Sequence, residues 1–294
     1  MLEAAEAKFL GKKTKYPQKY DPNFLVAVPR YINRKIYGIY EENLPFTGID
    51  VWHAWEVSFC TQRGLPVSGV VKLLYPAQSK FIVESKSLKL YLNSFNMEQL
   101  AEDRTQSINT FLKIVKKDIS KLLSTNIEIT FFKNDEKDKG FDYLDYPLLE
   151  NINTTANIVF KHYTENVKLL KKSSNKTVKS IKYSTHLLRS NCKITNQPDW
   201  GTVYIYLKGR NKPTPESLLS YIVSLRNENH FHEEICELIY KRLYDYFTPE
   251  ELMVTCIYTR RGGIDISPSR SSHPHLMPKH LTNSTILSQK LLRQ

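Results

Sequence analysis

Residues 181–207 read IKYSTHLLRSNCKITNQPDWGTVYIYL, and their pattern is the strongest indication of the fold in this chain. The runs Ile181–Leu188 and Thr202–Leu207 are rich in aromatic and β-branched residues, which favour strands. The connection between them is polar, and its Asn196 and Pro198 disfavour a helix. Two strands joined in this way predict an antiparallel hairpin.

Two helices and two further strands are predicted after this hairpin. Residues 213–216 (PTPE) open a helix with proline at an early position, where helices tolerate it. A second helix is predicted over Phe231–Tyr246, where apolar residues recur every three or four positions. Leu252–Tyr258 is predicted to be a strand, and Ile264–Ile266 a short final one.

The first half of the chain repeats this order. Ile49–Phe59 and Val67–Tyr75 are predicted strands, helices are predicted from Ser85 and over residues 102–123, and Ile127–Phe132 is a strand again. Each half is therefore expected to follow the order strand, strand, helix, helix, strand, strand. Two such units predict an α+β fold with antiparallel sheets and helices on one face, rather than a parallel Rossmann sheet.

The chain divides into two halves and a linker. We place the N-terminal half at residues 1–165, with an arm of residues 1–45 that lacks clear periodicity. Residues 166–180 are expected to form a basic linker, because lysines are frequent there among Ser and Asn. The C-terminal half covers residues 181–294, and its tail, residues 267–294, is rich in Ser, Pro and His and is expected to pack loosely.

Composition excludes several classes of protein. The chain has 294 residues, 41% of them hydrophobic and 24% charged, which is typical of a globular protein large enough for its own core. No apolar run approaches the roughly 18 residues of a membrane span, and the first residues lack the apolar stretch of a signal peptide, so we expect a cytoplasmic protein. Neither GxGxxG nor GxxxxGK[ST] occurs, so a nucleotide cofactor would not bind in a Rossmann crevice or a P-loop.

The net charge of +12 leaves two interpretations open. A basic surface attracts phosphate, which suits RNA or the phosphates of a cofactor. A lysine-rich surface also simply keeps many soluble enzymes dispersed.

The four cysteines, Cys60, Cys192, Cys236 and Cys256, form no C-x-x-C pair, so neither a zinc ribbon nor a thioredoxin motif is available. Cys236 and Cys256 lie in apolar periodic segments, which indicates burial. Cys192 lies in a polar segment just after a strand, which indicates exposure and makes it the candidate for a reactive thiol. A turn could bring Asp199, seven residues further on, back beside it as an acid or a base.

Residues 230–234 (HFHEE) form a second candidate segment. Its histidines are two positions apart, whereas a helical zinc pair needs a spacing of four. A helix start there would present His232 and Glu233 to a cleft, where the carboxylate accepts two N–H groups of a guanine-like edge and the imidazole moves a proton. The alternative is a surface carboxylate that only favours the helix dipole.

Two further segments are suited to phosphate. Residues 83–91 (VESKSLKLY) place serines and lysines at a helix start, whose N–H groups and charges can hold an anion; the alternative is an N-capped surface helix. Residues 260–263 (RRGG) combine two guanidinium groups with flexible backbone, or form only a hairpin turn. His273 and His275 in the tail have no third ligand nearby, and we expect no metal.

These four segments together closely resemble the QueF family, the NADPH-dependent 7-cyano-7-deazaguanine (preQ0) reductases. The resemblance covers most of the chain and is to the long form, which has two tandem tunnelling-fold halves. The matching motifs, in chain order, are FIVESKSLKLYLNSFN at residues 81–96, THLLRSNCKITNQPDWG at 185–201, LRNENHFHEEIC at 225–236 and YTRRGGIDI at 258–266.

The resemblance implies a role for each matching residue. Cys192 corresponds to the family's nucleophile and Asp199 to its proton donor, and His232 is implicated in proton transfer. Substrate contacts are implied for Val83, Glu84, Ser85, His232 and Glu233. NADPH contacts are implied for Ser85, Lys86, Arg261 and Gly262.

The reaction implied by the resemblance is the reduction of the preQ0 nitrile to the aminomethyl product preQ1, in the biosynthesis of the tRNA modification queuosine. A nitrile carbon is a poor hydride acceptor, and addition of the Cys192 thiolate would give a thioimide that accepts hydride more easily. The resemblance also implies NADPH as co-substrate and a homodimer. We expect no direct contact with nucleic acid or membrane.

Two other functions remain open from the sequence. A basic tRNA- or RNA-binding module would account for the charge and the 18 tyrosines; it would bind RNA with a steep salt dependence and would not need Cys192. A metal-dependent tunnelling-fold cyclohydrolase would need a ligand set, and the sequence offers no convincing group of His and Cys residues.

Overall fold

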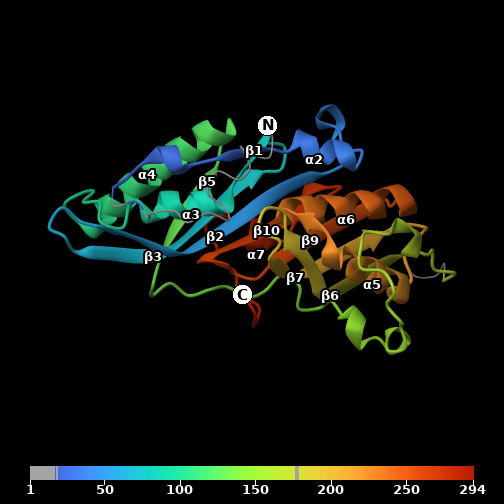
Figure 1. Cartoon of the computed structure of the whole chain (residues 1–294). Coiled ribbons are helices and arrows are strands. Elements are labelled where there is room, and N and C mark those ends of the chain that lie inside the picture. The colour runs from blue at the N-terminus through green and yellow to red at the C-terminus, as the bar shows by residue number, and fades with distance from the viewer. Residues whose placement is uncertain (1–16, 18, 176–178) are drawn as a thin grey trace.

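The computed structural model describes residues 17, 19–175 and 179–294. Within these residues the main feature is one sheet of eight strands in the order β5-β3-β2-β10-β9-β7-β6-β8 (Figure 1). Neighbouring strands pair antiparallel except β6 and β8, so the predicted antiparallel α+β fold is confirmed. The strands are β2 (Thr47–Cys60), β3 (Pro66–Pro76), β5 (Glu128–Lys133), β6 (Ser180–Cys192), β7 (Pro198–Lys208), β8 (Asn229–His230), β9 (Glu251–Tyr258) and β10 (Ile264–Ser271).

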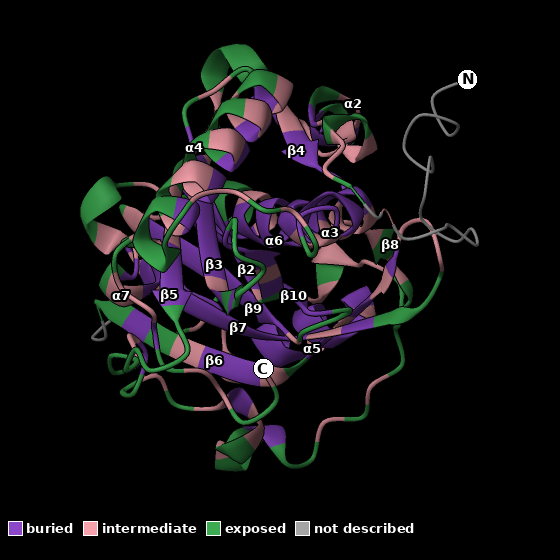
Figure 2. Cartoon of the chain, turned by 90° about the vertical axis from the view of Figure 1, so that its left-hand side faces the viewer, coloured by how far each residue is buried: buried purple, intermediate pink, exposed green. Residues whose placement is uncertain are grey.

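Long helices cover one face of this sheet, as expected. Apolar residues of α3 and α4 form one buried cluster with β2, β3 and β5, and those of α5 and α6 form another with β6, β7 and β9. In Figure 2 the buried residues of the strands and helices are purple. The helices are α3 (Ser85–Asn93), α4 (Arg104–Leu123), α5 (Pro215–Ser224) and α6 (His232–Phe247). Shorter elements are α2 (Tyr31–Ile36), α7 (Lys279–Thr282) and the paired strands β1 (Ala27–Pro29) and β4 (Phe81–Val83).

Strand β10 joins the two halves of the chain into one sheet. It pairs with β2 of the first half along its whole length, and with β9 of the second half at its far end. Ile264 and Ile266 belong to the cluster under the helices, whereas Asp265 between them faces the opposite side. The halves therefore share a full strand of hydrogen bonds and do not form separate sheets.

Two expectations about the strands are wrong within the described residues. The first half has one strand after its helices, β5, because the segment that follows is charged and lacks apolar alternation. Strand β10 continues to Ser271, so residues 267–271, expected in the loose tail, are buried in the sheet. Arg270 is tolerated there because Asp50 and Glu237 neutralise its charge at 2.8 Å each.

The arm and the linker pack more closely than expected. Asn33 and Arg34 on α2 are 4% and 2% exposed, and α2 lies against α6. In the linker, Leu170 is buried, and Lys172 forms a β-bridge with the segment just before α5. Parts of both predicted regions lie outside the described residues, namely 1–16, 18 and 176–178.

The C-terminal segment covers the face of the sheet opposite the helices. The buried Lys72 on β3 donates hydrogen bonds to the carbonyl oxygens of His280, Asn283 and Ile286, at 3.0, 2.8 and 2.6 Å. Three carbonyl groups at the end of the chain are thus satisfied by one ammonium group. In the described part of the chain, no helix combines the length and the apolar character that crossing a membrane requires.

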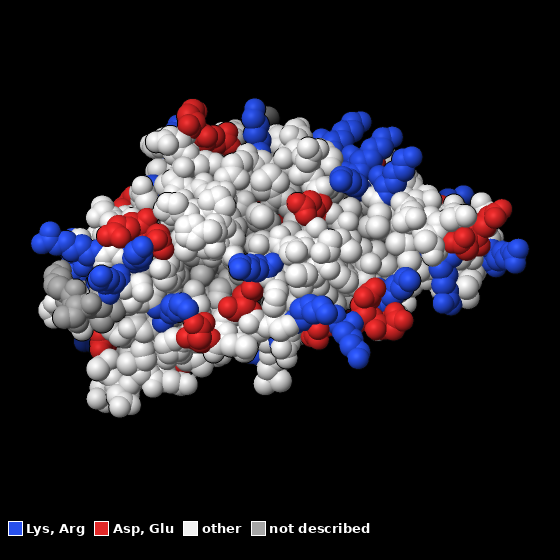
Figure 3. All heavy atoms as spheres, turned by 180° about the vertical axis from the view of Figure 1, so that it is seen from behind, with Lys and Arg blue, Asp and Glu red and all other residues white. Residues whose placement is uncertain are grey.

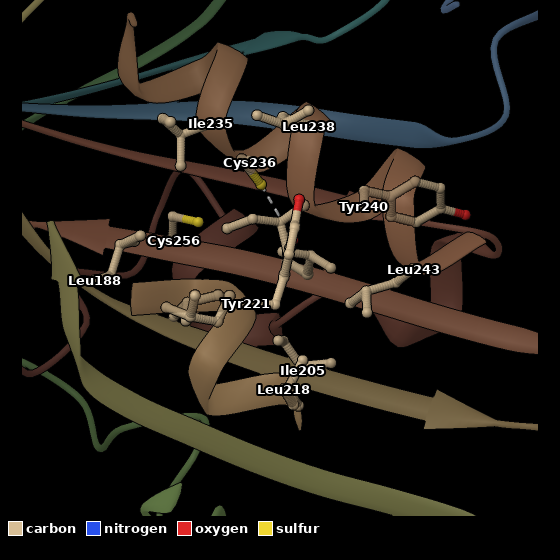
Figure 4. Packing of buried hydrophobic residues seen from close by; sticks show 14 of the residues in the cluster. Leu188, Ile205, Leu218, Tyr221, Ile235, Cys236, Leu238, Tyr240, Leu243 and Cys256 are labelled. Atoms are coloured by element: carbon tan, nitrogen blue, oxygen red, sulfur yellow. Dashed lines mark hydrogen bonds between the residues drawn. The ribbon is translucent and has the colours of Figure 1, made fainter. Parts of the chain in front are cut away.

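Cys236 and Cys256 lie inside the core of the second half, between α6 and β9 (Figure 4). Both are 0% exposed, and the Cys236 Sγ is 3.4 Å from the carbonyl oxygen of Val254. Their predicted burial is confirmed, which leaves them a packing role.

Candidate active site

A cavity of about 330 Å³ lies where the two halves of the chain meet. Strand β4 and the start of α3 come from the first half; the β6–β7 hairpin, the start of α6 and the β9–β10 turn come from the second. Every predicted site residue except Glu84 lines this cavity: Val83, Ser85, Lys86, Cys192, Asp199, His232, Glu233, Arg261 and Gly262. Apolar walls are supplied by Trp52, Ile82, Phe231, Ile264 and Ile266.

Cys192 is the last residue of β6, and a tight turn follows it. The Cys192 N–H donates to the carbonyl of Gln197 at 2.8 Å, and the Asn196 N–H donates back to the carbonyl of Cys192 at 3.0 Å. Asp199 is paired with Ser190 across the hairpin, so its side chain lies on the same face of the sheet as that of Cys192. The structure thus places both side chains at the end of one hairpin, lining the same cavity.

The expected exposure of Cys192 is wrong, because the residue is buried, with only 9% of its surface exposed. Strand β8 pairs with the end of β6, with His230 opposite Cys192, and α6 begins directly after it. This cover comes from residues almost forty positions away, and the polar neighbours of Cys192 in the sequence give no sign of it. Cys192 nevertheless lines the cavity.

Asp199 is held by two basic side chains. Its Oδ2 is 3.3 Å from His232 Nε2 and its Oδ1 is 2.5 Å from Arg261, which also donates to Gln197. Burial alone would raise the pKa of Asp199, but the hydrogen bonds and charges of His232 and Arg261 outweigh it and lower the pKa. The free site therefore holds an ionised carboxylate within 3.3 Å of the His232 ring.

The His232 ring is held in one orientation. It stacks on Tyr258 with the ring centres 3.8 Å apart and the planes 9° from parallel. With Nε2 directed at Asp199, the buried Nδ1 has no hydrogen-bond partner in the protein. An unpartnered ring nitrogen in a ligand cavity is available to a bound molecule.

Glu233 lies at the start of α6 and is buried. It is therefore not the surface carboxylate that would only favour the helix dipole. It is 2% exposed, and its Oε1 has no hydrogen-bond partner in the protein. Burial and the nearby negative charge of Asp50 raise its pKa to about 8, against the opposing charges of Arg30 and Arg270. A ligand that offers N–H groups would satisfy this carboxyl group and stabilise its ionised form.

Glu84 has a different place from its neighbours Val83 and Ser85. Its carboxylate caps α3, accepting hydrogen bonds from the N–H groups of Lys86 at 3.0 Å and Ser87 at 2.6 Å. Burial raises its pKa even though these N–H groups oppose the shift. The helix N–H groups expected to hold a phosphate are therefore already occupied, and an anion here would be held by the side chains of Lys86 and Lys89, which line the cavity.

Residues 260–263 form a hairpin turn that also faces the cavity, so both interpretations of RRGG apply. Arg261 and Ile264 exchange backbone hydrogen bonds of 2.9 and 3.1 Å. Gly262 and Gly263 have φ values of +57° and +78°, and a Cβ on Gly263 would lie 2.4 Å from the Cδ of Glu56. The turn needs glycine there, and it fixes the Arg261 backbone beside the Cys192 hairpin.

Sequence reasoning missed several residues of the cavity. Gln197 lies two positions before Asp199 within a motif already singled out, and it binds Arg261. The sequence marks His230 only as one of two histidines spaced wrongly for a helical zinc site, because its pairing with Cys192 depends on strand β8. Trp52 is an apolar strand residue with no local signal of a site. Among the described residues no group of three or more His, Cys, Asp or Glu side chains could hold a metal.

A thiol, an Asp–His pair and a buried carboxyl group with one unpartnered oxygen surround one cavity, and groups of this kind are the ones that enzymes with a cysteine nucleophile use. Family models match two parts of the chain: "Nitrile reductase, 7-cyano-7-deazaguanine-reductase N-term" at residues 16–131 and "QueF-like protein" at residues 198–275. The chain belongs to the QueF family of nitrile reductases.

Full-length relatives support this assignment. The chain is 39% identical over 283 residues to the NADPH-dependent 7-cyano-7-deazaguanine reductase of Acinetobacter baumannii (strain ACICU), covering 94% of this chain and 97% of the relative. It is 38% identical over 266 residues to the enzyme of the same description from Coxiella burnetii (strain CbuK_Q154), covering 90% and 91%. A solved structure of an archaeosine synthase QueF-Like in the apo form is 19% identical, covers 34% of this chain and 98% of that one, and has a TM-score of 0.29.

Proposed function

We propose that this protein is an NADPH-dependent reductase that converts the nitrile of preQ0 to the aminomethyl group of preQ1, in the pathway to the tRNA modification queuosine. The observation that carries the proposal is the single cavity that gathers Cys192, Asp199, His232 and Glu233 with Ser85, Lys86, Arg261 and Gly262. The relatives of the same length carry the name of this activity.

The cavity suits a small planar base. Its volume of about 330 Å³ is at the lower end of what small-molecule sites require. The Glu233 carboxyl group, whose Oε1 has no partner in the protein, would accept the two N–H groups of the guanine-like edge, and the apolar walls would cover the ring faces. A base without those N–H groups would leave Glu233 buried and unpaired, which costs binding free energy.

The first chemical step is the addition of the thiol to the nitrile. The Cys192 sulfur bonds to the nitrile carbon, one π bond of the C≡N group breaks, and the thiol proton ends on the nitrogen through Asp199 and His232. The product is a thioimide, an isomer of thiol plus nitrile, so no atom is gained or lost. Its C=N bond accepts a hydride more easily than the nitrile does.

Two reductions complete the reaction. NADPH, when bound, supplies a hydride to carbon in each of them. After the first, the nitrogen lone pair expels the Cys192 thiolate and leaves an imine; after the second, the nitrogen holds the amine of preQ1. For each reduction Asp199 and His232 deliver the accompanying proton from solvent, so two hydrides and two protons are taken up in all.

The residues present fit the cofactor. Lys86, Lys89 and Arg261 line the cavity and are suited to phosphate groups. The Gly262 turn allows close approach to the backbone. We assign the NADPH contacts to Ser85, Lys86, Arg261 and Gly262, and the substrate contacts to Val83, Ser85, His232 and Glu233, with Glu84 supporting them through its cap on α3.

We further propose that the protein is a cytoplasmic homodimer with no direct nucleic-acid contact. Each subunit would consist of the halves 1–165 and 181–294. RNA binding is the weaker interpretation because acidic residues lie among the basic ones on the face in Figure 3.

A filter-binding titration at two salt concentrations tests RNA affinity, and light scattering after size exclusion tests the dimer. Tight, salt-steep RNA binding would favour the other function.

The decisive experiment is intact-mass spectrometry after mixing the protein with preQ0 in the absence of NADPH. We expect a mass increase equal to one preQ0, located at Cys192 by peptide mapping. The Cys192→Ala variant should form no adduct and oxidise no NADPH, whereas Cys60→Ser, outside the cavity, should behave like the wild type. Turnover retained by Cys192→Ala would reject the mechanism.

A further inference from the structure

The N-terminal arm reaches the two elements that carry the reactive groups. Asn33, on α2, is 4% exposed and bonds with both ends of its amide. Its Oδ1 accepts from Lys193 Nζ at 2.5 Å, and its Nδ2 donates to Glu234. Lys193 directly follows Cys192 in the chain, and Glu234 directly follows Glu233. One buried amide thus connects the neighbour of the thiol to the neighbour of the carboxyl group that would hold the substrate.

The three partners also contact one another. Lys193 Nζ is 3.7 Å from Glu234 Oε1 and lies 5.6 Å from the centre of the Phe231 ring, which lines the cavity. Glu234 in turn caps α6, accepting from the N–H of Phe231 at 3.3 Å. We call Asn33, Lys193 and Glu234 the arm clamp. It closes the gap between the turn after β6 and the start of α6.

A second link from the same arm reaches the partner strand of the thiol. The hydroxyl of Tyr37 is 2.9 Å from Nδ1 of His230, and the same nitrogen is 3.2 Å from Glu234 Oε2. His230 lies opposite Cys192 in the β6–β8 pair. The arm therefore fixes the position of Cys192 from both sides, through the turn that follows it and through the strand beside it.

We propose that Asn33 is a positioning residue, and that the arm clamp sets the distance between the Cys192 sulfur and a substrate held by Glu233. This inference rests on the proposed function for the identity of the substrate. Asn33 does not line the cavity, so it acts only through Lys193 and Glu234. A displacement of about 1 Å between reacting groups is enough to slow a reaction by about 100-fold.

The test compares Asn33→Leu with Asn43→Leu, the same change at an exposed position of the arm. We expect Asn33→Leu to slow formation of the Cys192 adduct by about 10- to 100-fold and to lower kcat more than it raises KM. Asn43→Leu should match the wild type. Equal adduct rates in the two variants, with only the melting temperature of Asn33→Leu lowered, would overturn the inference.

Lys193→Met provides a variant that is safer for folding, because the Lys193 side chain is 25% exposed. It removes the same contact, so the double variant Asn33→Leu/Lys193→Met should be no slower than the slower single variant. Rate losses that multiply in the double variant would mean that the two residues act independently, and would contradict the clamp.

The proposed function and the clamp fail in different ways. If the wild type forms no adduct with preQ0, the proposed function is wrong. The rate of Cys192 alkylation by iodoacetamide, read from peptide mass spectrometry, still tests the clamp, because it needs no substrate. An alkylation rate that Asn33→Leu and Lys193→Met both leave unchanged would reject the clamp whatever the substrate is.

Discussion

Two carboxyl groups in the same cavity have their pKa values shifted in opposite directions. Basic neighbours lower the pKa of Asp199, whereas burial raises the pKa of Glu233 to about 8. Opposite shifts of this kind separate the roles of titratable groups in active sites. These shifts agree with the proposed roles: proton transfer by Asp199 with His232, and recognition of the substrate by Glu233.

Substrate affinity should depend on pH through Glu233. The ionised carboxylate accepts two N–H groups and the protonated form does not, so binding requires loss of the proton. In the Cys192→Ala background, which prevents chemistry, we expect affinity for preQ0 to rise about tenfold per pH unit up to about pH 8 and then to level off. Calorimetric titration from pH 6 to 9 measures this.

The control for this dependence is Glu233→Gln, which should bind weakly and equally at all these pH values. An affinity that is flat with pH in a protein retaining Glu233 would mean that this carboxyl group is already ionised in the free site.

Removing the carboxylate of Asp199 should slow proton delivery. We expect Asp199→Asn to bind preQ0 normally and to form the thioimide about 10²–10⁴ times more slowly, the usual contribution of a positioned acid or base. Rapid mixing with detection of the adduct absorbance gives the rate. Asp145→Asn, the same change at an exposed ion pair with Lys182, should have no effect. A rate for Asp199→Asn within tenfold of wild type would exclude it as the proton donor.

At the level of elements, the hairpin between β6 and β7 determines where the reactive groups lie. Its turn depends on Asn196, whose φ of +55° falls in the left-handed region, and whose side chain accepts from Asn229. Asparagine tolerates this conformation better than most residues. The turn brings Asp199 back beside Cys192 in a short polar loop.

Asn196→Val should disturb this hairpin, because a β-branched residue is strained in that conformation. We expect a loss of about 1–2 kcal/mol in the free energy of unfolding, measured by urea titration. Asn196→Gly should fold nearly as well as the wild type, and Thr195→Val in the same turn should be close to neutral. A fully stable Asn196→Val protein would show that the turn can adopt another conformation.

Hydrophobic periodicity predicted the strands and helices well wherever the pattern lies within the segment itself. The hairpin, the helices from Ser85 and over 102–123, and the strand at 252–258 follow from alternation and spacing that the sequence displays. Strand β10 was predicted only to Ile266, because Arg270 reads as a surface residue until Asp50 and Glu237 are known to surround it. Contacts between distant segments decide such positions.

The candidate site likewise has features that the local sequence predicts and features that depend on contacts between distant segments. The motifs brought Cys192 and Asp199 together correctly, since only a turn separates them. The burial of Cys192 and the place of Asn33 depend on β8 and α2, whose partners lie about 40 and 160 positions away. The capping of α3 by the Glu84 carboxylate likewise depends on the backbone conformation at the start of the helix.

Across the whole molecule, a buried group of charges connects the arm with both halves. Glu237 on α6 lies 2.8 Å from both Arg34 and Arg270, and 3.7 Å from Arg30, and Arg30 and Arg270 also bind Asp50. The arginines together lower the pKa of Glu237 to about 2, against the effect of burial. Loss of one carboxylate would leave buried positive charge unpaired.

We expect Glu237→Gln to cost about 3–5 kcal/mol of stability, as for other broken buried pairs. Because its folded pKa is lowered from 4.5 to about 2, the stabilisation by Glu237 is complete above about pH 4.5 and is lost as the pH falls toward 2. Thermal unfolding at pH 7 and pH 3 measures both effects.

At pH 3 the difference in stability between the wild type and Glu237→Gln should be much smaller than at pH 7. Glu251→Gln, which breaks a more exposed pair with Lys208, should change the melting temperature far less. A gap between wild type and Glu237→Gln that is the same at both pH values would show that the loss comes from packing and not from charge.

The position of β10 in the sheet also constrains how the chain is made. This strand lies in the middle of the sheet, bonded to β2 on one side and to β9 on the other, yet it comes from the last part of the sequence. During synthesis the ribosome must release residues 264–271 before the early strands can meet the late ones. A nascent chain that lacks the last thirty-one residues would lack β10. The strands β2 and β9 would then be unpaired edge strands of two separate sheets, and such edges are prone to aggregation.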